Sequence, residues 1–281
     1  MVSRRAAGRH ALTYAAAAPF LLFALFPFAW MLVTSLKTNA ELYDLGQNPF
    51  RIRAGITWDH YRYLFERTAF PLWLRNSATV ALAATVGSVA LAAPAAYALA
   101  RLRFRGAEAV ATLVFLVYLV PTTVLFIPLA RIVTQLGLAN SLWALVVTYP
   151  AFIVPFLVWM LAAYLSTIPR ELEDSALVDG CSRLRTLRHV VLPVARPGLV
   201  TAALFAFTLA WGEFIYALTF ISTTDRKTVT AGVVVNLIRG DVFFWGSLMA
   251  GALLASVPVV VLFSLFLDHY VSGLTAGAVK G

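Results

Sequence analysis

The sequence predicts an all-α polytopic membrane protein. Of its 281 residues, 61% are hydrophobic and only 12% are charged, whereas soluble domains carry about 25% charged residues. The chain also contains six apolar runs long enough for membrane helices, which need roughly 20 residues because backbone groups in hydrocarbon must bond to each other. These observations exclude a soluble, disordered, collagen-like or disulfide-framed protein.

The six runs are expected to form a single transmembrane domain over residues 1–281, with both termini on one side of the membrane. The first run holds 26 uncharged residues, more than the roughly 7 to 15 of a signal-peptide core, so it is interpreted as a retained anchor. The expected spans cover residues 11–36, 76–100, 109–130, 141–168, 197–221 and 242–267.

The net charge of +9 is interpreted as membrane topology and not as nucleic-acid binding, because no basic run of five or more residues occurs. With both termini cytoplasmic, that side carries 12 of the 22 Lys and Arg residues, a bias too small to fix the orientation by itself. The arginine clusters within 4–9 and 101–105 each lie beside a span end and favour cytoplasmic termini.

Four segments lie outside the expected spans and are longer than turns. Residues 37–71 are expected to form an ordered external cap, and residues 222–241 a second external segment. A short tail, 268–281, follows the last span. Residues 169–196 are expected on the cytoplasmic side and hold nine charged residues among 28, so the functional signal is concentrated there.

The first half of this cytoplasmic loop has the signals of a short helix. Pro169 suits a first helical position, and Glu171, Glu173 and Asp174 complement the positive end of the helix dipole. Gly180 is expected to end the helix, because glycine tolerates a positive φ.

The second half predicts another helix, with Ser182 as its N-cap and Pro193 as its stop. The loop is thus a bent two-helix knob with an acidic and a basic arm. From the pattern alone, either a docking element or an ordinary solvated loop is possible. The apolar positions of the second helix are Leu184, Leu187 and Val191, and its arginines are Arg183, Arg185 and Arg188.

The segment 174–193 resembles the EAA loop of ABC importer permeases, whose pattern is E-A-A, two residues, D-G-A and a downstream L-P. It departs from the pattern by Asp for Glu, Ser for Ala and Cys for Ala, and Leu187 stands where Phe is usual. The matched residues are Asp174, Ser175 and Ala176, then Asp179, Gly180 and Cys181, then Leu192 and Pro193.

Three further segments are similar to the maltose-type, MalG-like sugar permeases. Residues 168–173 look like their I-P-x-E-L-E lead-in, 211–214 like their W-N-[DE]-F turn, and 272–281 like their C-terminal signature. The resemblance implies a permease subunit of an ATP-driven importer that forms half of a translocation path. It favours a di- or oligosaccharide as substrate, and relatives that carry glycerol phosphodiesters remain an alternative.

In this family the knob docks in a groove of a cytoplasmic ATPase. The resemblance implies that Asp179 and Gly180 fix the bend, that the acids of the first arm meet basic groups of the ATPase, and that arginines of the second arm meet acidic ones. The tail residues Thr275, Gly277 and Lys280 would lie between ATPase subunits. The implied coupling residues are Glu171, Glu173, Asp174, Ala176, Asp179, Gly180, Cys181, Arg183, Arg185, Leu187 and Pro193.

The resemblance also implies the partners: a second homologous permease, two ATPase subunits or a homodimer of one, and an extracytoplasmic substrate-binding protein. Because the chain has no G-x-x-x-x-G-K-[ST] phosphate cradle, ATP and Mg are expected in the partner ATPase, and the chain itself is not expected to be an enzyme. The expected location is the plasma (inner) membrane of a bacterium or archaeon. The residues expected to meet the binding protein, or to form an ordinary surface loop, are Asp225, Arg226, Lys227 and Asn236.

Glu213 is the one ionisable residue inside an expected span, and such residues usually face protein or water. It could approach the substrate path together with Trp211 and Tyr216, or it could pair structurally with a neighbouring span or the partner permease. The sequence favours the structural interpretation.

Two other classes of function fit the sequence poorly. A secondary transporter usually shows paired intramembrane charges and internal repeats, and this chain has one acid and no clear repeat. An intramembrane enzyme needs a catalytic motif, and neither H-E-x-x-H nor G-x-S-x-G is present. The single cysteine, Cys181, excludes an intrachain disulfide and a cysteine metal cage, so neither a metal site nor a catalytic residue is expected.

Overall fold

The computed structural model describes residues 4–44, 46, 48–102 and 104–267, with side chains from Leu12 onward. The tail residues Thr275, Gly277 and Lys280, expected to meet the ATPase, lie outside the described residues. The fold is helical apart from one two-stranded hairpin within the described part of the chain. The chain divides into two compact units, Met1–Phe70 with Val233–Ser256, and Pro71–Gly232 with Val257–Gly281.

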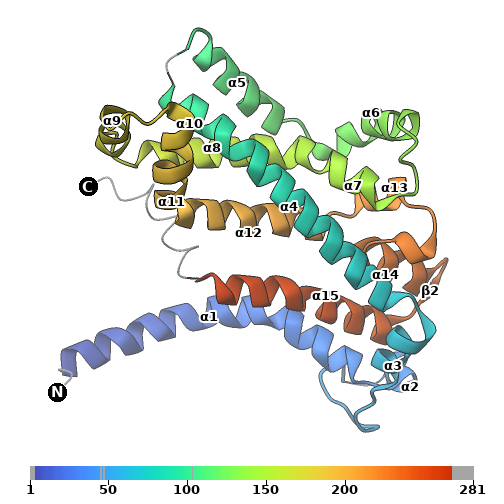
Figure 1. Cartoon of the computed structure of the whole chain (residues 1–281). Helices are drawn as coiled ribbons and strands as arrows, with labels where there is room; N and C mark the ends of the chain where they lie inside the picture. The colour runs from blue at the N-terminus through green and yellow to red at the C-terminus, as the bar shows by residue number, and fades with distance from the viewer. Residues whose placement is uncertain (1–3, 45, 47, 103, 268–281) are drawn as a thin grey trace. The chain divides into compact units, whose positions relative to one another are not determined.

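The first unit contains one long helix and a small extramembrane cap. Helix α1 continues through Pro19 and Pro27, as membrane helices tolerate. The hairpin turns at Gly240, whose φ is +59°. The elements are α1 (Arg4–Ser35), α2 (Asn39–Leu42), α3 (Asp59–Arg67), β1 (Ile238–Arg239), β2 (Val242–Phe243) and the first part of α15 (Trp245–Leu265), shown in Figure 1.

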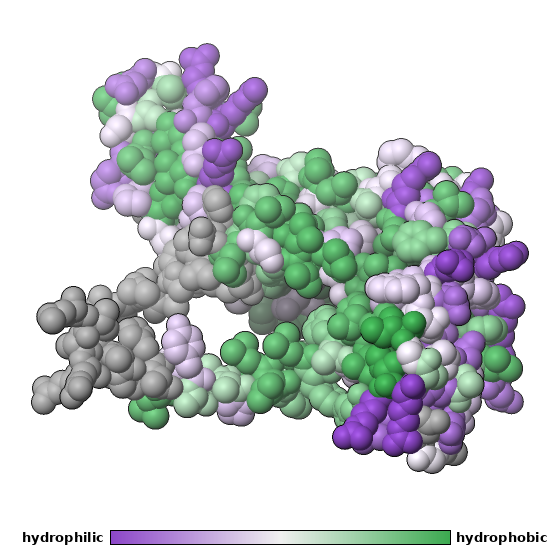
Figure 2. Space-filling view, turned by 90° about the horizontal axis from the view of Figure 1, so that it is seen from below, coloured by the Kyte–Doolittle hydropathy of each residue, from purple (hydrophilic) through white to green (hydrophobic). Residues whose placement is uncertain are grey.

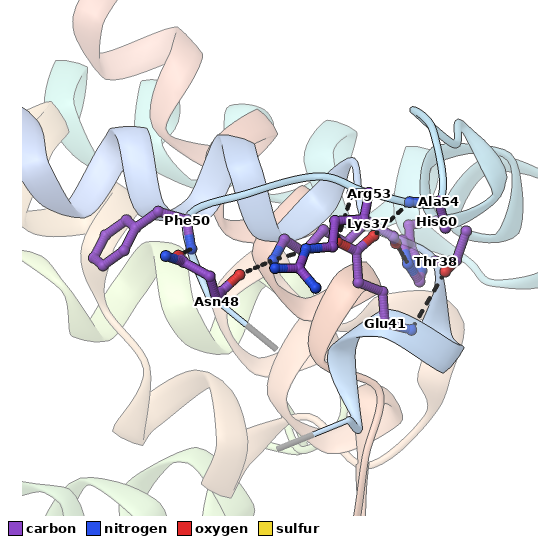
Figure 3. A network of polar contacts seen from close by, with 8 residues as sticks. All are labelled: Lys37, Thr38, Glu41, Asn48, Phe50, Arg53, Ala54 and His60. Carbon is purple, nitrogen blue, oxygen red and sulfur yellow. Dashed lines mark hydrogen bonds and ion pairs between the residues drawn. The ribbon is translucent and has the colours of Figure 1, made fainter. Parts of the chain in front are cut away.

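A buried ion pair organises the cap segment, as Figure 3 shows. The Lys37 ammonium lies 3.7 Å from the Glu41 carboxylate, and their side chains are 3% and 1% exposed. Lys37 also donates a hydrogen bond to the carbonyl of Asn48, while Glu41 accepts one from the backbone N–H of Arg53 at 2.8 Å. These bonds connect Asn48 and Arg53 to Lys37 and Glu41, and an ordered cap over 37–71 stays a prediction.

The imidazole of His60 connects the end of α1 with the start of α15. Its Nε2 bonds the carbonyl oxygen of Lys37 at 2.8 Å, and its Nδ1 lies 3.3 Å from the Ser247 hydroxyl. A Cβ at Gly246 would lie 2.1 Å from the His60 ring. The absence of a side chain at Gly246 is therefore required for α3 to approach α15.

The second unit holds the remaining helices around a core of buried aromatic and aliphatic side chains, among them Trp73, Tyr149 and Leu157. Helix α8 packs on α5 and α12, and a Cβ at Gly198 would lie 2.5 Å from the Tyr164 ring. Its membrane-length and connecting elements are α4 (Phe70–Arg101), α5 (Ala107–Tyr118), α6 (Thr122–Gln135), α7 (Leu142–Thr148), α8 (Pro150–Ser166), α12 (Arg196–Gly212), α13 (Ile215–Phe220), η2 (Thr224–Arg226) and α14 (Val229–Leu237), of which α4 and α14 extend into the first unit.

Six spans were expected. Among the described residues, four continuous helices are long and apolar enough to span a membrane, and the number rises to six if each bent helix pair forms one span. Residues 109–130 do not form one continuous helix, because α5 and α6 meet at a bend of 96°, and a single span over this range stays a prediction. Pro121 lies at this break, lacks an N–H, and disfavours helical backbone in the residue before it. The run 197–221 is also divided, since α12 ends at Gly212 and α13 begins at Ile215.

Large apolar side chains face outward on many helices. Figure 2 shows hydrophobic residues covering much of the visible face and hydrophilic residues gathered toward its margins. In the apolar window of α1 no residue is buried, and Phe20 and Phe23 are 78% and 84% exposed. This surface is suited to lipid tails or to another membrane chain, and not to water.

We expect Glu41→Ala to loosen the cap, because removing one partner of a buried ion pair leaves the other charge uncompensated and costs about 3 kcal/mol or more. Tryptic cleavage after Arg51 or Arg53, both exposed, should then accelerate by roughly 100-fold, since such cleavage follows the population of the opened segment. The control is Glu66→Ala, which breaks a pair with side chains 68% and 62% exposed. Equal cleavage of the two variants would contradict the role of Glu41.

Candidate functional site

The cytoplasmic loop forms the bent knob that the sequence predicts. Helix α9 (Glu171–Val178) ends at Gly180, whose φ is +83°, and the Cys181 N–H bonds the carbonyl of Ala176 at 3.0 Å. The Ser182 hydroxyl accepts a bond from the Arg185 N–H and caps α10 (Arg183–Thr186). The glycine stop and the serine cap are therefore confirmed.

The second arm does not stop at Pro193. It continues as a π-helix, η1 (Leu187–Val191), and as the turn α11 (Leu192–Val194), in which Pro193 lies at a first-turn position. The Leu192 N–H bonds the carbonyl of Leu187 five residues back. A proline ring collides with the carbonyl four residues before it, and the wider π turn leaves room for the ring.

The bend of the knob, between α9 and α10 in Figure 1, carries two exposed apolar side chains, which form its tip. Val178 is 87% exposed and Leu184 is 75% exposed, while Asp179 and Gly180 at the bend are exposed as well. The sequence analysis placed Leu184 on a helix face but did not recognise this tip. Of the remaining expected coupling residues, Glu171, Asp174, Arg183, Arg185 and Pro193 are exposed, Cys181 is half-buried, and Ala176 and Leu187 are buried.

Glu173 does not fit the expectation that it faces a partner. Its Oε1 lies 2.9 Å from Nε of Arg101, and its Oε2 accepts a hydrogen bond from the Tyr97 hydroxyl at 3.0 Å. Arg101 and Tyr97 were not expected at the site. They lie one turn apart on the same face of α4, the arrangement that i,i+4 spacing gives, but no local pattern in the sequence connects them with Glu173.

A cavity of about 230 Å³ lies beside this pair at the base of α9. Its lining combines guanidinium and carboxylate groups, so it suits a polar group of either charge better than an apolar one. The lining residues are Arg101, Arg170, Glu173, Asp174, Leu177 and Arg183.

Glu213 bridges the break between α12 and α13. Its Oε1 accepts the Tyr216 N–H at 2.8 Å, and its Oε2 accepts the Ala217 N–H at 3.0 Å and the Tyr149 hydroxyl at 2.9 Å. The carboxylate therefore caps α13 and stabilises the positive end of its dipole. This geometry favours the structural interpretation of Glu213.

The other two residues considered for a substrate path are buried in the protein. Trp211 is 6% exposed and its ring stacks on Phe207. Tyr216 is 1% exposed, and its hydroxyl donates to the carbonyl of Thr122 at 2.9 Å. Contact of these residues with a substrate stays a prediction that this conformation does not support.

The residues expected to meet the binding protein differ in how far they are exposed. Asp225 and Arg226 are exposed, and Arg226 donates to the carbonyl of Asn140 at 2.6 Å. Lys227 is 5% exposed and donates to the carbonyl of Ile221, and burial lowers the pKa of its ammonium. The expectation for Lys227 is thus wrong, because its charge is buried and bonded within the chain. Asn236, in the other compact unit, is half-buried.

A protein-family model described as "Binding-protein-dependent transport system inner membrane component" matches residues 88–275. The chain belongs to this family. The matched range includes the knob, α12 and α13. Together with the apolar helices, it makes the chain a multi-pass membrane protein and a permease component of a transport system.

Relatives that are named for their substrates are similar to this protein over almost the whole chain. The sulfoquinovosyl glycerol transport permease SmoH of Agrobacterium fabrum is 37% identical, over 96% of this chain and 94% of its own. The trehalose/maltose transport permease MalG of Thermococcus litoralis is 35% identical, over 92% and 93%. The trehalose transport permease SugB of Mycobacterium tuberculosis is 36% identical, also over 92% and 93%.

The fold matches a solved structure, the crystal structure of a bacterial ABC transporter involved in the import of the acidic polysaccharide alginate. The TM-score is 0.77 at 18% identity, covering 96% of this chain and 99% of the other. At this identity the likeness shows a shared fold and nothing finer.

We expect Glu213→Gln to destabilise the protein, because an amide has one acceptor oxygen and places an N–H₂ donor against a backbone or hydroxyl donor. The loss of a charge-assisted cap bond corresponds to about 2 kcal/mol, which should appear as a lower midpoint of thermal unfolding in detergent. Glu108→Gln, at an exposed position in the first turn of α5, is the control. An unchanged midpoint for Glu213→Gln would contradict the capping role.

Proposed function

We propose that this chain is the permease subunit of a sugar ABC importer and forms half of its translocation path. The proposal depends on one observation above all. Relatives at 35–37% identity over more than nine-tenths of the chain carry the names of trehalose, maltose and sulfoquinovosyl glycerol transport permeases. A di- or oligosaccharide is the favoured cargo, and a glycerol phosphodiester is the alternative.

The energy source in this proposal is a partner ATPase that binds ATP and Mg and docks on the knob. The exposed Val178 and Leu184 would fill an apolar groove, and the exposed arginines Arg183 and Arg185 would face acidic groups on its rim. Such an arrangement, an apolar anchor with a polar rim, is how protein interfaces generally concentrate their binding energy.

The remaining partners in the proposal are a second permease, which completes the path, a second ATPase subunit, and an extracytoplasmic substrate-binding protein. Support for the binding protein comes from the family description. It also comes from the structural match to an alginate ABC transporter in complex with a pentasaccharide-bound periplasmic protein, with a TM-score of 0.67 at 16% identity. Both termini and the knob would face the cytoplasm of a bacterial or archaeal cell.

The substrate class is tested with the cognate binding protein, titrated calorimetrically with trehalose, maltose, longer glucosides and glycerophosphodiesters. We expect saturable binding of a saccharide, and proteoliposomes holding the assembled transporter should take up that saccharide only when ATP is present. Saturation by a glycerophosphodiester alone would replace the sugar by the alternative. ATP-independent uptake driven by an ion gradient would overturn the importer assignment.

The bend of the knob is tested at Gly180, where a Cβ would meet no other atom of the chain within 4 Å, so within the chain a substitution acts through backbone strain. A left-handed conformation costs an L-residue about 1–2 kcal/mol, or roughly a 5- to 30-fold loss in the population of the bend. We expect ATP-driven uptake to fall in the order Gly, Asn, Ala, Val, with the chain still inserted in the membrane.

Gly106 provides a matched control, because its φ is +84° and its Cβ site is equally open. Gly106→Ala should therefore carry the same strain outside the knob and keep most of the uptake. Equal losses at both glycines would show general destabilisation, and unchanged uptake in Gly180→Val would contradict the role of the bend.

A further inference from the structure

The base of the knob is joined to the membrane helices by one buried arginine. Arg101, the last residue of α4, is 4% exposed at its side chain and forms an ion pair with Glu173, which is 9% exposed. Its Nη2 also donates to the carbonyl of Leu165 at 2.7 Å and to the carbonyl of Ile168. One guanidinium thus contacts the coupling helix α9 and the carboxyl end of α8 from its position on α4.

Glu173 stands apart from the rest of the loop. Of the nine charged residues in 169–196, all of them in the described part of the chain, Glu173 alone is buried. The Tyr97 hydroxyl bonds its second oxygen, so the carboxylate has a partner on each side. The exposed charges are available to an ATPase, whereas this one is directed into the permease itself.

Stability alone does not explain this ion pair. A buried salt bridge gains little over well-packed apolar residues, because desolvation offsets the attraction between the charges, but its geometry is specific. Arginine supplies several donors in a rigid fork. One side chain can therefore hold a carboxylate and two carbonyl oxygens in a fixed arrangement, which an apolar contact cannot do.

Helix α9 needs such an attachment. It has eight residues, and isolated helices shorter than about 12–15 residues are marginal in water. It packs against α10 and η1 within the knob, so without the arginine a force on its exposed tip would turn the knob about the chain segments at its base. With the arginine in place, the same force acts on the ends of α4 and α8.

We propose that Arg101 is the positioning residue that makes α9 move as one body with the cytoplasmic ends of α4 and α8, so that displacement of the knob reaches the membrane helices. The inference rests on the proposed function, because it takes the displacement to come from an ATPase. Arg101 acts through Glu173 and the two carbonyls and touches neither substrate nor nucleotide.

The test uses the complete transporter in nanodiscs, with Cys181→Ser to remove the native thiol. Spin labels are placed at Leu172→Cys on α9 and at Leu91→Cys on α4, which are 42% and 59% exposed and lie away from the tip that meets the ATPase. With wild-type Arg101 the distance between the labels should be narrowly distributed and unchanged by Mg–ATP with vanadate. In Arg101→Gln it should broaden and shift on addition of Mg–ATP with vanadate, while ATP hydrolysis persists and uptake per ATP falls at least tenfold.

Matched variants separate positioning from folding. Arg105→Gln removes an exposed arginine four residues further along and should behave as the wild type. Tyr97→Phe removes only the hydroxyl bond to Glu173 and should lower uptake per ATP by a few-fold in a fully assembled complex. If Arg101→Gln does not assemble, the uptake per ATP of Tyr97→Phe tests the inference in its place.

A distance distribution in assembled Arg101→Gln as narrow and as unresponsive as in the wild type would overturn the inference. So would Tyr97→Phe with undiminished uptake per ATP, if Arg101→Gln fails to assemble. A wild-type chain that binds no ATPase, or whose complex with the ATPase hydrolyses ATP without any uptake, would instead overturn the proposed function. The two failures are therefore distinguishable.

Discussion

A helix that ends or breaks inside a membrane protein leaves backbone N–H or C=O groups that water does not reach, and these groups must be bonded by something else. This constraint accounts for three polar side chains that are buried or half-buried. Glu213 accepts the N–H groups at the start of α13, and Arg101 donates to the carbonyls at the end of α8. His60 bonds the carbonyl of Lys37 just beyond α1. These three polar residues are located at helix ends, where apolar side chains cannot substitute for them.

The sequence predicted the helical class and the positions of the apolar segments because hydrocarbon demands long, uncharged runs. It did not predict where two of those runs bend, since a proline such as Pro121 is tolerated in many membrane helices and does not by itself announce a break. The pattern around Gly180 and Ser182 was local, and so its bend was predicted correctly. The partners of Glu173 and Glu213 were not local. Tyr97 lies 76 residues from Glu173, and Tyr149 lies 64 residues from Glu213, and no periodicity connects positions so far apart.

The fold and the substrate class are inferred from different kinds of similarity. A TM-score of 0.77 at 18% identity is physically reasonable, because a lipid-facing helix needs length and apolarity, and many sequences supply both. The same tolerance means that the shared fold says little about what passes through the protein, since function resides in specific sites and not in the fold. The sugar proposal accordingly depends on relatives at 35–37% identity over nearly the whole chain.

The knob has two ends with opposite properties, and this difference explains how it can transmit motion. Its tip exposes Val178 and Leu184, which a partner can contact, while its base holds the buried ion pair of Glu173 and Arg101. A short helix moves with the element to which it is bonded most strongly. Hydrogen bonds to an ionised group are roughly twice as strong as neutral ones. The hydrogen-bond acceptors of Arg101 are the backbone carbonyls of Leu165 and Ile168, which no side-chain substitution can remove. The arginine and the helix ends therefore fix the orientation of the base of the knob, whereas the tip can adapt to its partner.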